Sequence, residues 1–562
     1  ARFGRPWYAS GKGAYYSASE TWVETVTLAG RAGPLDALLL LTRRDGHETE
    51  NNGATPANPK DIGSNSALAK LVWRAGESST FRLTGEFFER DTETDVVSDR
   101  TATLLSRLAE EESRRRRVSL AHEYRDAGAG LVQAVRWQVY YQDGETRDTA
   151  DERRIVGGSE RLRLRDNAFL QEVYGVDLRL ESNFRTWVLD HRLTYGLDGS
   201  LTETSRPRDG IEYDLTAGTS TRFIGGEAFP NKTFVDTDTW RAGVYVQDEI
   251  GVGPAARRTS IIPAVRLDYY RLNPRPDADF ARINTRDAMV DEVSEFAVSP
   301  KLGVIVGLTR ELAAFVQYAR GFRSPPYDEV GTAFTNFTFG YTVLPNPDLR
   351  PETSDGFEVG LRGAYRPVRF RVVGFYNLYD DFIETVPVGE VDGLDAFQAR
   401  NLTEVRIFGA EAEVEVALGA FWPALEGFRL VGAAAYAEGD NEETDQPLDS
   451  VAPPNGVVSL RYREPRDRWG AEVATTIVAP KHRVADDGSG GSPFRTPGFV
   501  TADLTAYYNV GRRVTLAAGV FNVLDRKYWL WDDVRGLAAD DSQLDLYTQP
   551  GRHASASVTV RF

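Results

Sequence analysis

The sequence predicts an all-β protein, a single closed antiparallel transmembrane β-barrel of about 22 strands. Three observations carry this prediction. Apolar and polar residues alternate with a period of two along many segments. Short and long connections between the predicted strands alternate along the chain. Aromatic residues make up 11% of the 562 residues, although the mean hydropathy is only -0.39. A barrel wall needs this combination, because half of each strand faces lipid, half faces water, and aromatic side chains mark both interfaces.

Composition excludes several other classes. No run of about 18 apolar residues occurs, so no transmembrane helix is expected, and a soluble chain of 562 residues would usually divide into several domains. The chain has no Cys, which rules out disulfides and thiolate metal sites. Its formal charge of -17 argues against nucleic-acid binding. Residues 1–10 lack the apolar segment of a secretory signal, so we expect the numbering to begin inside a mature or truncated protein.

Period-two alternation is clearest in four segments, which begin at Tyr174, Trp240, Phe408 and Val500. In the first of them one face carries no charge, and the opposite face is polar or ionised. The uncharged face holds Tyr174, Val176, Leu178 and Leu180, and the other holds Gly175, Asp177, Arg179 and Glu181. A soluble β-sandwich alternates in the same way, so alternation alone leaves both classes open.

The lengths of the connections favour the barrel. Short connections are predicted at 31–34, 75–78, 125–130, 182–185, 251–258, 308–311, 366–368, 418–427, 463–467 and 509–512. Longer polar segments are predicted at 46–65, 91–113, 143–167, 205–236, 273–294, 322–350, 380–401, 438–454, 481–497 and 524–550. Tight periplasmic turns and long extracellular loops have this pattern, and an even strand number places both chain ends on the periplasmic side. A barrel of roughly 22 strands belongs to the plugged transporters rather than to the porins.

The last strand carries an additional mark. Apolar residues share one of its faces, and the chain ends on an aromatic side chain. These residues are Ala554, Ala556, Val558, Val560 and Phe562. A terminal strand of this kind resembles the assembly signal that the outer-membrane insertion machinery recognises, although an ordinary closing strand can also stop at Phe.

Two motifs flank one predicted external loop. The segment 321–325 (GFRSP) resembles the FRAP box of TonB-dependent outer-membrane receptors, with Ser in place of Ala, and 346–352 (NPDLRPE) resembles their NPNL box. The matching residues are Phe322, Arg323, Pro325, Asn346, Pro347 and Leu349. Residues 193–198 (LTYGLD) and 521–528 (FNVLDRKY) are similar to strand motifs that recur in the same family. The resemblance therefore runs through most of the chain.

Residues 41–47 (LTRRDGH) and 528–536 (YWLWDDVRG) resemble the haem and haemoglobin-receptor branch of that family. The resemblance implies active transport of haem, or of haem taken from a haem-carrying protein, with haem as cargo and no intrinsic cofactor. It also implies an outer membrane with its lipid and lipopolysaccharide as surroundings. The family carries an N-terminal plug domain that contacts TonB. Residues 1–562 are all assigned to the barrel, so the plug is expected to be cleaved, removed, a separate chain or never present.

The loop between the two boxes is the predicted ligand site. Many haem receptors place a His there, but residues 324–345 contain none. Some relatives use Tyr instead, and haem iron accepts a Tyr oxygen, so Tyr327 or Tyr341 is the predicted iron ligand. Arg323 is expected to stabilise a phenolate or to pair with a haem propionate. The residues expected to stack on a porphyrin are Phe334, Phe337 and Phe339. The alternative is that these aromatics only order the loop.

Other functions stay open at this point. A siderophore or cobalamin transporter of the same family is one alternative, and a passive plugless pore or structural barrel is another. An outer-membrane enzyme is disfavoured, because no Ser/His/Asp-type set is visible on one face and Asp248 and Glu249 point to opposite faces of a strand. The five His show no metal spacing, and His191 is expected on the lipid face. Residues 114–117 (RRRR) are expected at the external start of a strand, facing lipopolysaccharide phosphates or solvent.

Overall fold

The computed structural model describes residues 6–126, 128–254, 258–284, 289–336, 340–485 and 492–562. A closed antiparallel barrel of 22 strands forms the molecule, as the sequence predicted. The first eleven wall strands are β1 (Trp7–Tyr16), β2 (Thr21–Ala32), β3 (Leu35–His47), β4 (Lys60–Arg74), β5 (Ser79–Asp95), β6 (Leu104–Arg125), β7 (Ala134–Val156), β8 (Ser159–Thr186), β9 (Leu189–Ser205), β15 (Asp236–Val252) and β16 (Thr259–Arg275). The others are β17 (Val293–Gly307), β18 (Leu312–Arg323), β21 (Glu352–Ala364), β22 (Val368–Val391), β23 (Leu394–Ala417), β24 (Phe428–Asn441), β26 (Asn455–Arg463), β27 (Trp469–Val478), β28 (Phe499–Val510), β29 (Val514–Phe521) and β30 (His553–Arg561).

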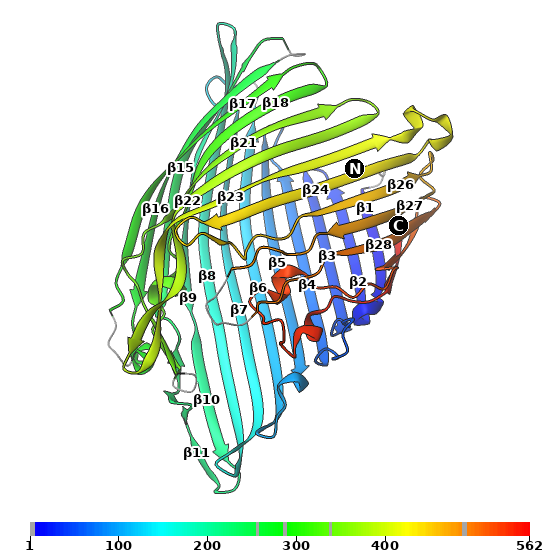
Figure 1. Cartoon of the computed structure of the whole chain (residues 1–562). Helices are drawn as coiled ribbons and strands as arrows, with labels where there is room; N and C mark the ends of the chain where they lie inside the picture. Colours follow the sequence, from blue (N-terminus) through cyan, green and yellow to red (C-terminus); the bar gives the residue numbers. More distant parts are fainter. Residues whose placement is uncertain (1–5, 127, 255–257, 285–288, 337–339, 486–491) are drawn as a thin grey trace.

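The first and last strands close the wall. Strand β1 pairs antiparallel with β30, from Ser10 opposite Arg561 to Tyr16 opposite Ser555. Both chain ends therefore lie at the same rim, and the tip formed by β10 (Pro207–Asp214) and β11 (Thr219–Thr221) lies at the opposite end of the molecule (Figure 1). The short connections gather at the rim with the chain ends, which makes that rim the periplasmic one.

Smaller elements fold the long connections. Besides β10 and β11 they are β12 (Phe223–Ile224), β13 (Glu227–Ala228), β14 (Asn231–Lys232), α1 (Ala278–Ile283), α2 (Tyr327–Gly331), β19 (Phe334–Asn336), β20 (Tyr341–Leu344), β25 (Gln446–Pro447) and α3 (Trp531–Val534). Short 3₁₀ turns are η1 (Ser17–Ser19), η2 (Val97–Asp99), η4 (Leu418–Ala420), η5 (Pro423–Leu425) and η6 (Leu544–Tyr547). Among the described residues, no helix has both the length and the apolar character needed to cross a membrane.

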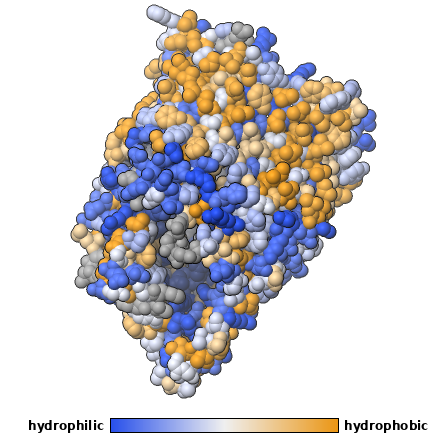
Figure 2. Space-filling view, viewed as in Figure 1, coloured by the Kyte–Doolittle hydropathy of each residue, from blue (hydrophilic) through white to orange (hydrophobic). Residues whose placement is uncertain are grey.

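The predicted alternation corresponds to an apolar outer face. Leu180 lies opposite Tyr195 on β9, and Val246 on β15 lies opposite Val265 on β16. Outward apolar positions run over spans such as 174–184 and 500–510, which match the roughly 9–11 residues that a tilted strand needs to cross a bilayer. Figure 2 shows apolar side chains gathered over the upper and right parts of this face, and hydrophilic ones below them. The upper band is the lipid-contacting belt.

Two predicted external loops are wrong, because strands continue through them. Strands β7 and β8 extend to a two-residue turn at Gly157 and Gly158, with φ of 59° and 85°. Strands β22 and β23 meet at Asp392 and Gly393, with φ of 53° and 74°. Positive φ at both central residues is the type I′ geometry that suits a twisted hairpin. The polar composition of 143–167 and 380–401 reflects strands that extend beyond the membrane into water.

Two smaller predictions also need correction. The turn predicted at 182–185 lies at Trp187 and Val188, because β8 continues to Thr186. The basic run 114–117 lies inside β6 rather than at the start of a strand. Its side chains consequently alternate between faces, so that they do not form one basic patch.

Strand β10 attaches the segment 206–235 to the extracellular extension of β8. Its register places Glu212 opposite Arg163, and the buried carboxylate receives Arg163 Nη2 at 2.7 Å and Arg161 Nη1 at 2.9 Å. Burial would raise the pKa of Glu212, but the hydrogen bonds and charges of Arg163 and Arg161 outweigh burial and hold the pKa below its ordinary value. This carboxylate therefore links β10 to the wall.

Replacing Glu212 by Gln should release β10. Removing one partner of a buried ion pair typically costs about 3–5 kcal/mol, so limited proteolysis within 206–235 should become much faster in E212Q. The matched control is E160Q, since Glu160 is 41% exposed beside Arg153 and should contribute less than about 1 kcal/mol. Equal cleavage rates for the two variants would contradict the role given to Glu212.

The same link should respond to pH. Because the folded-state pKa of Glu212 is lowered, its contribution is complete above the unfolded value of about 4.3 and is lost as pH falls through the folded value. Proteolysis of 206–235 in the unmodified protein should accelerate below about pH 4. In E212Q the rate should already be high at neutral pH and should change less over that range.

Candidate functional site

The predicted ligand loop is a folded extracellular structure and packs on the barrel mouth. Residues 341–344 of β20 pair in parallel with β23, and Phe234 bridges to Thr332. A buried apolar cluster lies beneath the loop and consists of Tyr270, Leu272, Val293, Val330, Leu349, Ile383 and Ala399. The loop is thus positioned by strands on several sides of the barrel mouth.

The two boxes hold the base of this loop. Tyr270 Oη donates to the Pro325 carbonyl at 2.7 Å, and Asn346 Nδ2 donates to the Ala399 carbonyl at 2.8 Å. Leu349 is fully buried in the apolar cluster. Phe322 lies in β18 opposite Thr353, and Pro347 is half-buried. In the described structure these motif residues have packing roles, which explains why the boxes occur at the two ends of the loop.

Arg323 is already neutralised by the protein. Its guanidinium contacts Glu329 and Glu352, each at 2.7 Å, and Glu352 also accepts the Ile383 N–H at 2.8 Å. Burial raises the pKa of Glu329 in spite of the ion pair with Arg323. A propionate that approaches Arg323 would have to displace one of these carboxylates.

The two candidate iron ligands have different surroundings. Tyr327, on α2, packs against Phe234 with ring centroids 4.9 Å apart and against Phe169 at 6.3 Å. Burial raises the pKa of Tyr327, so its phenolate forms only with help from a metal or a base. Tyr341 lies between Phe334 and Phe397, with both ring centroids at 6.1 Å. Phe337 and Phe339 lie outside the described residues.

Residues that the sequence did not single out join this loop to the segment 206–235. Arg208 lies over Phe229 and over Phe334, with its guanidinium carbon 5.5 Å from each ring centroid. Phe169 and Phe234 supply the rings that cover Tyr327. No local motif marks these residues, because they come from β8, β10 and a loop that are distant in sequence from α2.

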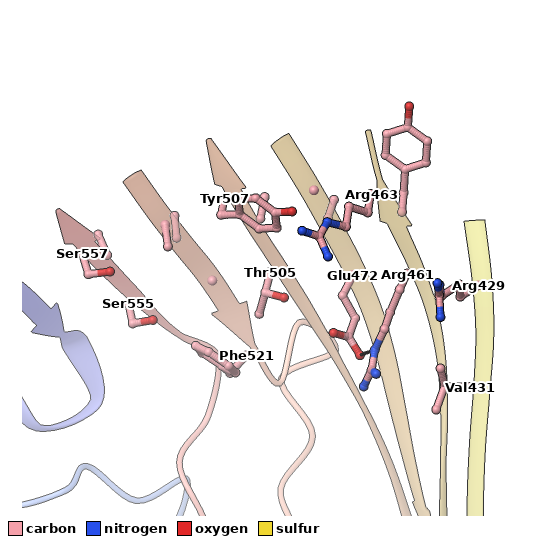
Figure 3. A pocket seen from close by; sticks show the side chains of 18 of the residues that line it. Arg429, Val431, Arg461, Arg463, Glu472, Thr505, Tyr507, Phe521, Ser555 and Ser557 are labelled. Atoms are coloured by element: carbon pink, nitrogen blue, oxygen red, sulfur yellow. Dashed lines mark hydrogen bonds and ion pairs between the residues drawn. The ribbon is translucent and has the colours of Figure 1, made fainter. Parts of the chain in front are cut away.

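A second candidate region lies on the inner wall of the barrel, away from the ligand loop. A recess of about 640 Å³ is lined by residues of β1, β23, β24, β26, β27, β28, β29 and β30. In Figure 3, Arg429, Arg461 and Arg463 line one side of it, and Ser555 and Ser557 line the other. Arg461 Nε contacts Glu472 Oε1 at 2.8 Å. The lining is mixed, and its Arg, Glu and Ser side chains offer hydrogen-bond donors and acceptors to a peptide surface.

One arrangement contradicts the expectation that no hydroxyl, imidazole and carboxylate share a face. Thr186 Oγ1 lies 2.7 Å from His191 Nε2, and His191 Nδ1 lies 2.7 Å from Asp248 Oδ2. The three groups belong to β8, β9 and β15, so the sequence could not bring them together. They lie on the lipid face beside the periplasmic turn at Trp187, where the two hydrogen bonds satisfy a His on an apolar surface. Among the described residues no cluster suited to a metal ion occurs.

The fold and these sites define an outer-membrane β-barrel with a folded extracellular mouth and a polar interior. The family profile described as "TonB dependent receptor-like, beta-barrel" matches residues 43–523. The chain therefore belongs to this family, and the protein is located in the outer membrane of a Gram-negative bacterium.

Curated relatives cover part of the chain. One is the "Probable hemoglobin and hemoglobin-haptoglobin-binding protein 4" of Haemophilus influenzae, 25% identical over 295 residues, which are 47% of this chain and 29% of the relative. Another is the "Hemoglobin-haptoglobin utilization protein B" of Neisseria meningitidis serogroup C, 25% identical over 292 residues, 45% of this chain and 36% of the relative. The chain thus spans about a third of the length of these relatives.

Solved structures share the fold. The "Copper transporter OprC" superposes with a TM-score of 0.75 at 18% identity, covering 99% of this chain and 80% of that chain. The Serratia marcescens hemophore receptor HasR, solved with its hemophore HasA and heme, superposes with a TM-score of 0.72 at 17% identity, covering 100% of this chain and 81% of that chain. Similarity at this identity establishes the barrel architecture alone.

Replacing Arg323 by Gln should loosen the base of the loop. Glu329 and Glu352 would lose their shared cation, and the free energy of local opening should fall by about 1–3 kcal/mol. The loss should be smaller than for a buried pair, since the Arg323 side chain is 47% exposed. Hydrogen exchange across α2 and β20 measures this effect. R350Q is the control, because Arg350 is 67% exposed beside Asp381, and equal exchange in both variants would refute the prediction.

Proposed function

We propose that this chain is the barrel of a receptor and active transporter for haem or a haem-carrying protein, energised through TonB. The observation that carries the proposal is the extracellular mouth, where a folded loop brings Tyr327 and Tyr341 into aromatic surroundings beside charged residues. A Tyr oxygen is an established axial ligand for haem iron, and aromatic rings stack on flat macrocycles. The haemoglobin-related names of the curated relatives favour the same class of cargo.

Transport also needs a movable barrier inside the barrel. We propose that a plug domain occupies the lumen and contacts the recess beside Arg461 and Ser555, whose mixed polar and apolar lining suits a protein surface that must later move. Energy would come from the inner membrane through TonB, which would act on that plug. The outward-facing Arg114 and Arg116 of β6 would contact lipopolysaccharide phosphates through charge-assisted hydrogen bonds.

Two other functions remain as alternatives. A siderophore or cobalamin transporter would use the same barrel with a different cargo. A passive pore would lack the plug.

Enzymatic activity is not part of the proposal. Thr186, His191 and Asp248 face lipid, and we assign them to joining β8, β9 and β15.

Haemin titration of the full gene product tests the cargo. The unmodified protein should give saturable binding with a shift of the Soret absorption band. Either Y327F or Y341F should lose the tyrosinate component of the spectrum and weaken binding about tenfold or more, because an iron ligand is removed. Y213F is the control, since Tyr213 is on the outward face of β10, opposite Leu162.

Two contrary results would separate the choice of cargo from the choice of iron ligand. Absence of saturable haemin binding would refute the haem proposal and favour a siderophore or cobalamin cargo. Normal binding and spectra in both Y327F and Y341F would leave the haem proposal in place but refute tyrosine ligation by this loop.

A further inference from the structure

The inner wall of the extracellular extension carries a dense group of arginines. The group lies where β7, β8 and β10 pair, and the register places its side chains on the same face as the lumen-lining positions. Its members are Arg154, Arg161, Arg163, Arg165 and Arg208, with the acids Glu152, Glu212, Asp214 and Glu227. Five guanidinium groups thus share four carboxylates. A sixth, Arg107, is neutralised by Asp99 at 3.0 Å.

Each of the four acids is already engaged by another arginine. Glu152 Oε2 forms an ion pair with Arg154 Nη1 at 3.1 Å, and Glu227 Oε2 forms one with Arg208 Nη1 at 3.0 Å. Glu212 receives Arg161 and Arg163, as described above, and Asp214 receives Arg161 at 3.5 Å. The acids that interact with Arg165 through space are therefore both ion-paired with other arginines, Glu152 with Arg154 and Glu227 with Arg208. Of the two, Glu227 keeps one buried oxygen that accepts no hydrogen bond in the described structure.

Arg165 is left with a surplus charge. Within the described part of the chain, no ion pair or hydrogen bond reaches its guanidinium, and its Nε is fully buried without a partner. Burial, together with the charges of Arg163 and Arg208, lowers the pKa of Arg165. A partly desolvated cation without a counter-charge is costly, so this position favours binding of an anion.

Small residues and an apolar cover surround Arg165 in the wall. The residues directly opposite on the neighbouring strands are Ala150 and Gly210. A Cβ at Gly210 would lie 3.3 Å from Ile224 and Phe229, so these apolar side chains cover that edge and exclude water. The Arg165 residue is partly exposed, and its register position directs the side chain toward the interior of the barrel.

Arg165 also lies near the ligand loop. It shares the inner face of β8 with Phe169, the residue that packs on Tyr327. Four residues of strand separate Arg165 from Phe169, roughly 13 Å. The membrane belt of β8 begins at Tyr174, roughly 30 Å of strand from Arg165, so the site opens into the extracellular mouth rather than into lipid.

We propose that Arg165 is an anion subsite of this mouth and receives a carboxylate of the cargo, a propionate where the cargo is haem. This inference rests on the proposed function and adds a residue that recognises the acidic edge of the ligand. The planar guanidinium binds a carboxylate through two parallel N–H···O contacts, which fixes orientation as well as charge. Arg208, stacked on Phe334, would hold the adjacent loop against this subsite.

The experiment compares haemin with haemin dimethyl ester, in which both carboxylates are blocked. On the full gene product, R165Q should weaken haemin binding about tenfold, as expected for loss of a charged hydrogen-bonded contact. Its affinity for the dimethyl ester should match that of the unmodified protein. R165K should fall between them, because lysine keeps the charge but lacks the fork. R147Q is the control, since Arg147 points outward and pairs with Asp166 at 3.5 Å.

Thermal unfolding separates binding from folding. Arg165 has no partner to lose, so R165Q should be at least as stable as the unmodified protein, whereas R163Q should be less stable because it breaks the contact with Glu212. A loss of stability in R165Q as large as in R163Q would overturn the assignment of Arg165 to ligand binding.

A titration with citrate, a simple polycarboxylate, keeps the two proposals distinguishable. If the unmodified protein binds haemin and R165Q binds it equally well, the subsite is refuted and the haem proposal stands. If the unmodified protein does not bind haemin, the haem proposal fails, and citrate decides the subsite. Citrate binding that is lost in R165Q supports the anion subsite for another cargo, and equal or absent binding refutes it.

Discussion

The hydrogen-bonded ladder between β1 and β30 closes the wall, and the rest of the molecule depends on it. Lipid offers no water to an unpaired N–H or C=O, so a sheet that spans a bilayer must have no free edge. The register that pairs Gly11 with Val560 also fixes which residues of every strand face inward. A shift by one residue would move the inward Arg and Glu side chains into lipid. Closure therefore determines where every charged group of the wall lies.

The same ladders continue beyond the membrane on part of the circumference. Strands β7, β8, β22 and β23 run well past the apolar belt, and the edges of β8 and β23 pair with β10 and β20 of the two external segments. Buried apolar residues such as Leu272 and Val330 complete this extracellular structure. The mouth is thus folded against strands rather than formed from independent loops, and a folded mouth loses less conformational entropy when it binds a ligand.

Period-two alternation and the residue composition of the turns account for the parts of the fold that the sequence could predict. Alternation and connection length identify the barrel wall, its strand number and the outward position of His191. These features can be predicted because each depends on the pattern of neighbouring residues along a strand. Both signals fail at 143–167, where polar residues on both faces resemble a loop although Gly157 and Gly158 form a hairpin turn. The boxes located a folded loop at the barrel mouth, but not its supports. Phe169 and Arg208 are brought to it only by tertiary packing, which leaves no local signal.

Ion pairing distinguishes two kinds of arginine in this mouth. Arg323 lies in a recognisable motif and was expected to contact ligand, yet Glu329 and Glu352 hold it at 2.7 Å. The charge of Arg323 is balanced by these two carboxylates, so a ligand carboxylate would gain little binding energy from it without displacing one of them. Arg165 lies in no motif, but the acids around it are engaged elsewhere. Because an uncompensated charge keeps more of its attraction for an external anion than a paired one, charge balance favours the proposed subsite at Arg165 over a ligand contact at Arg323.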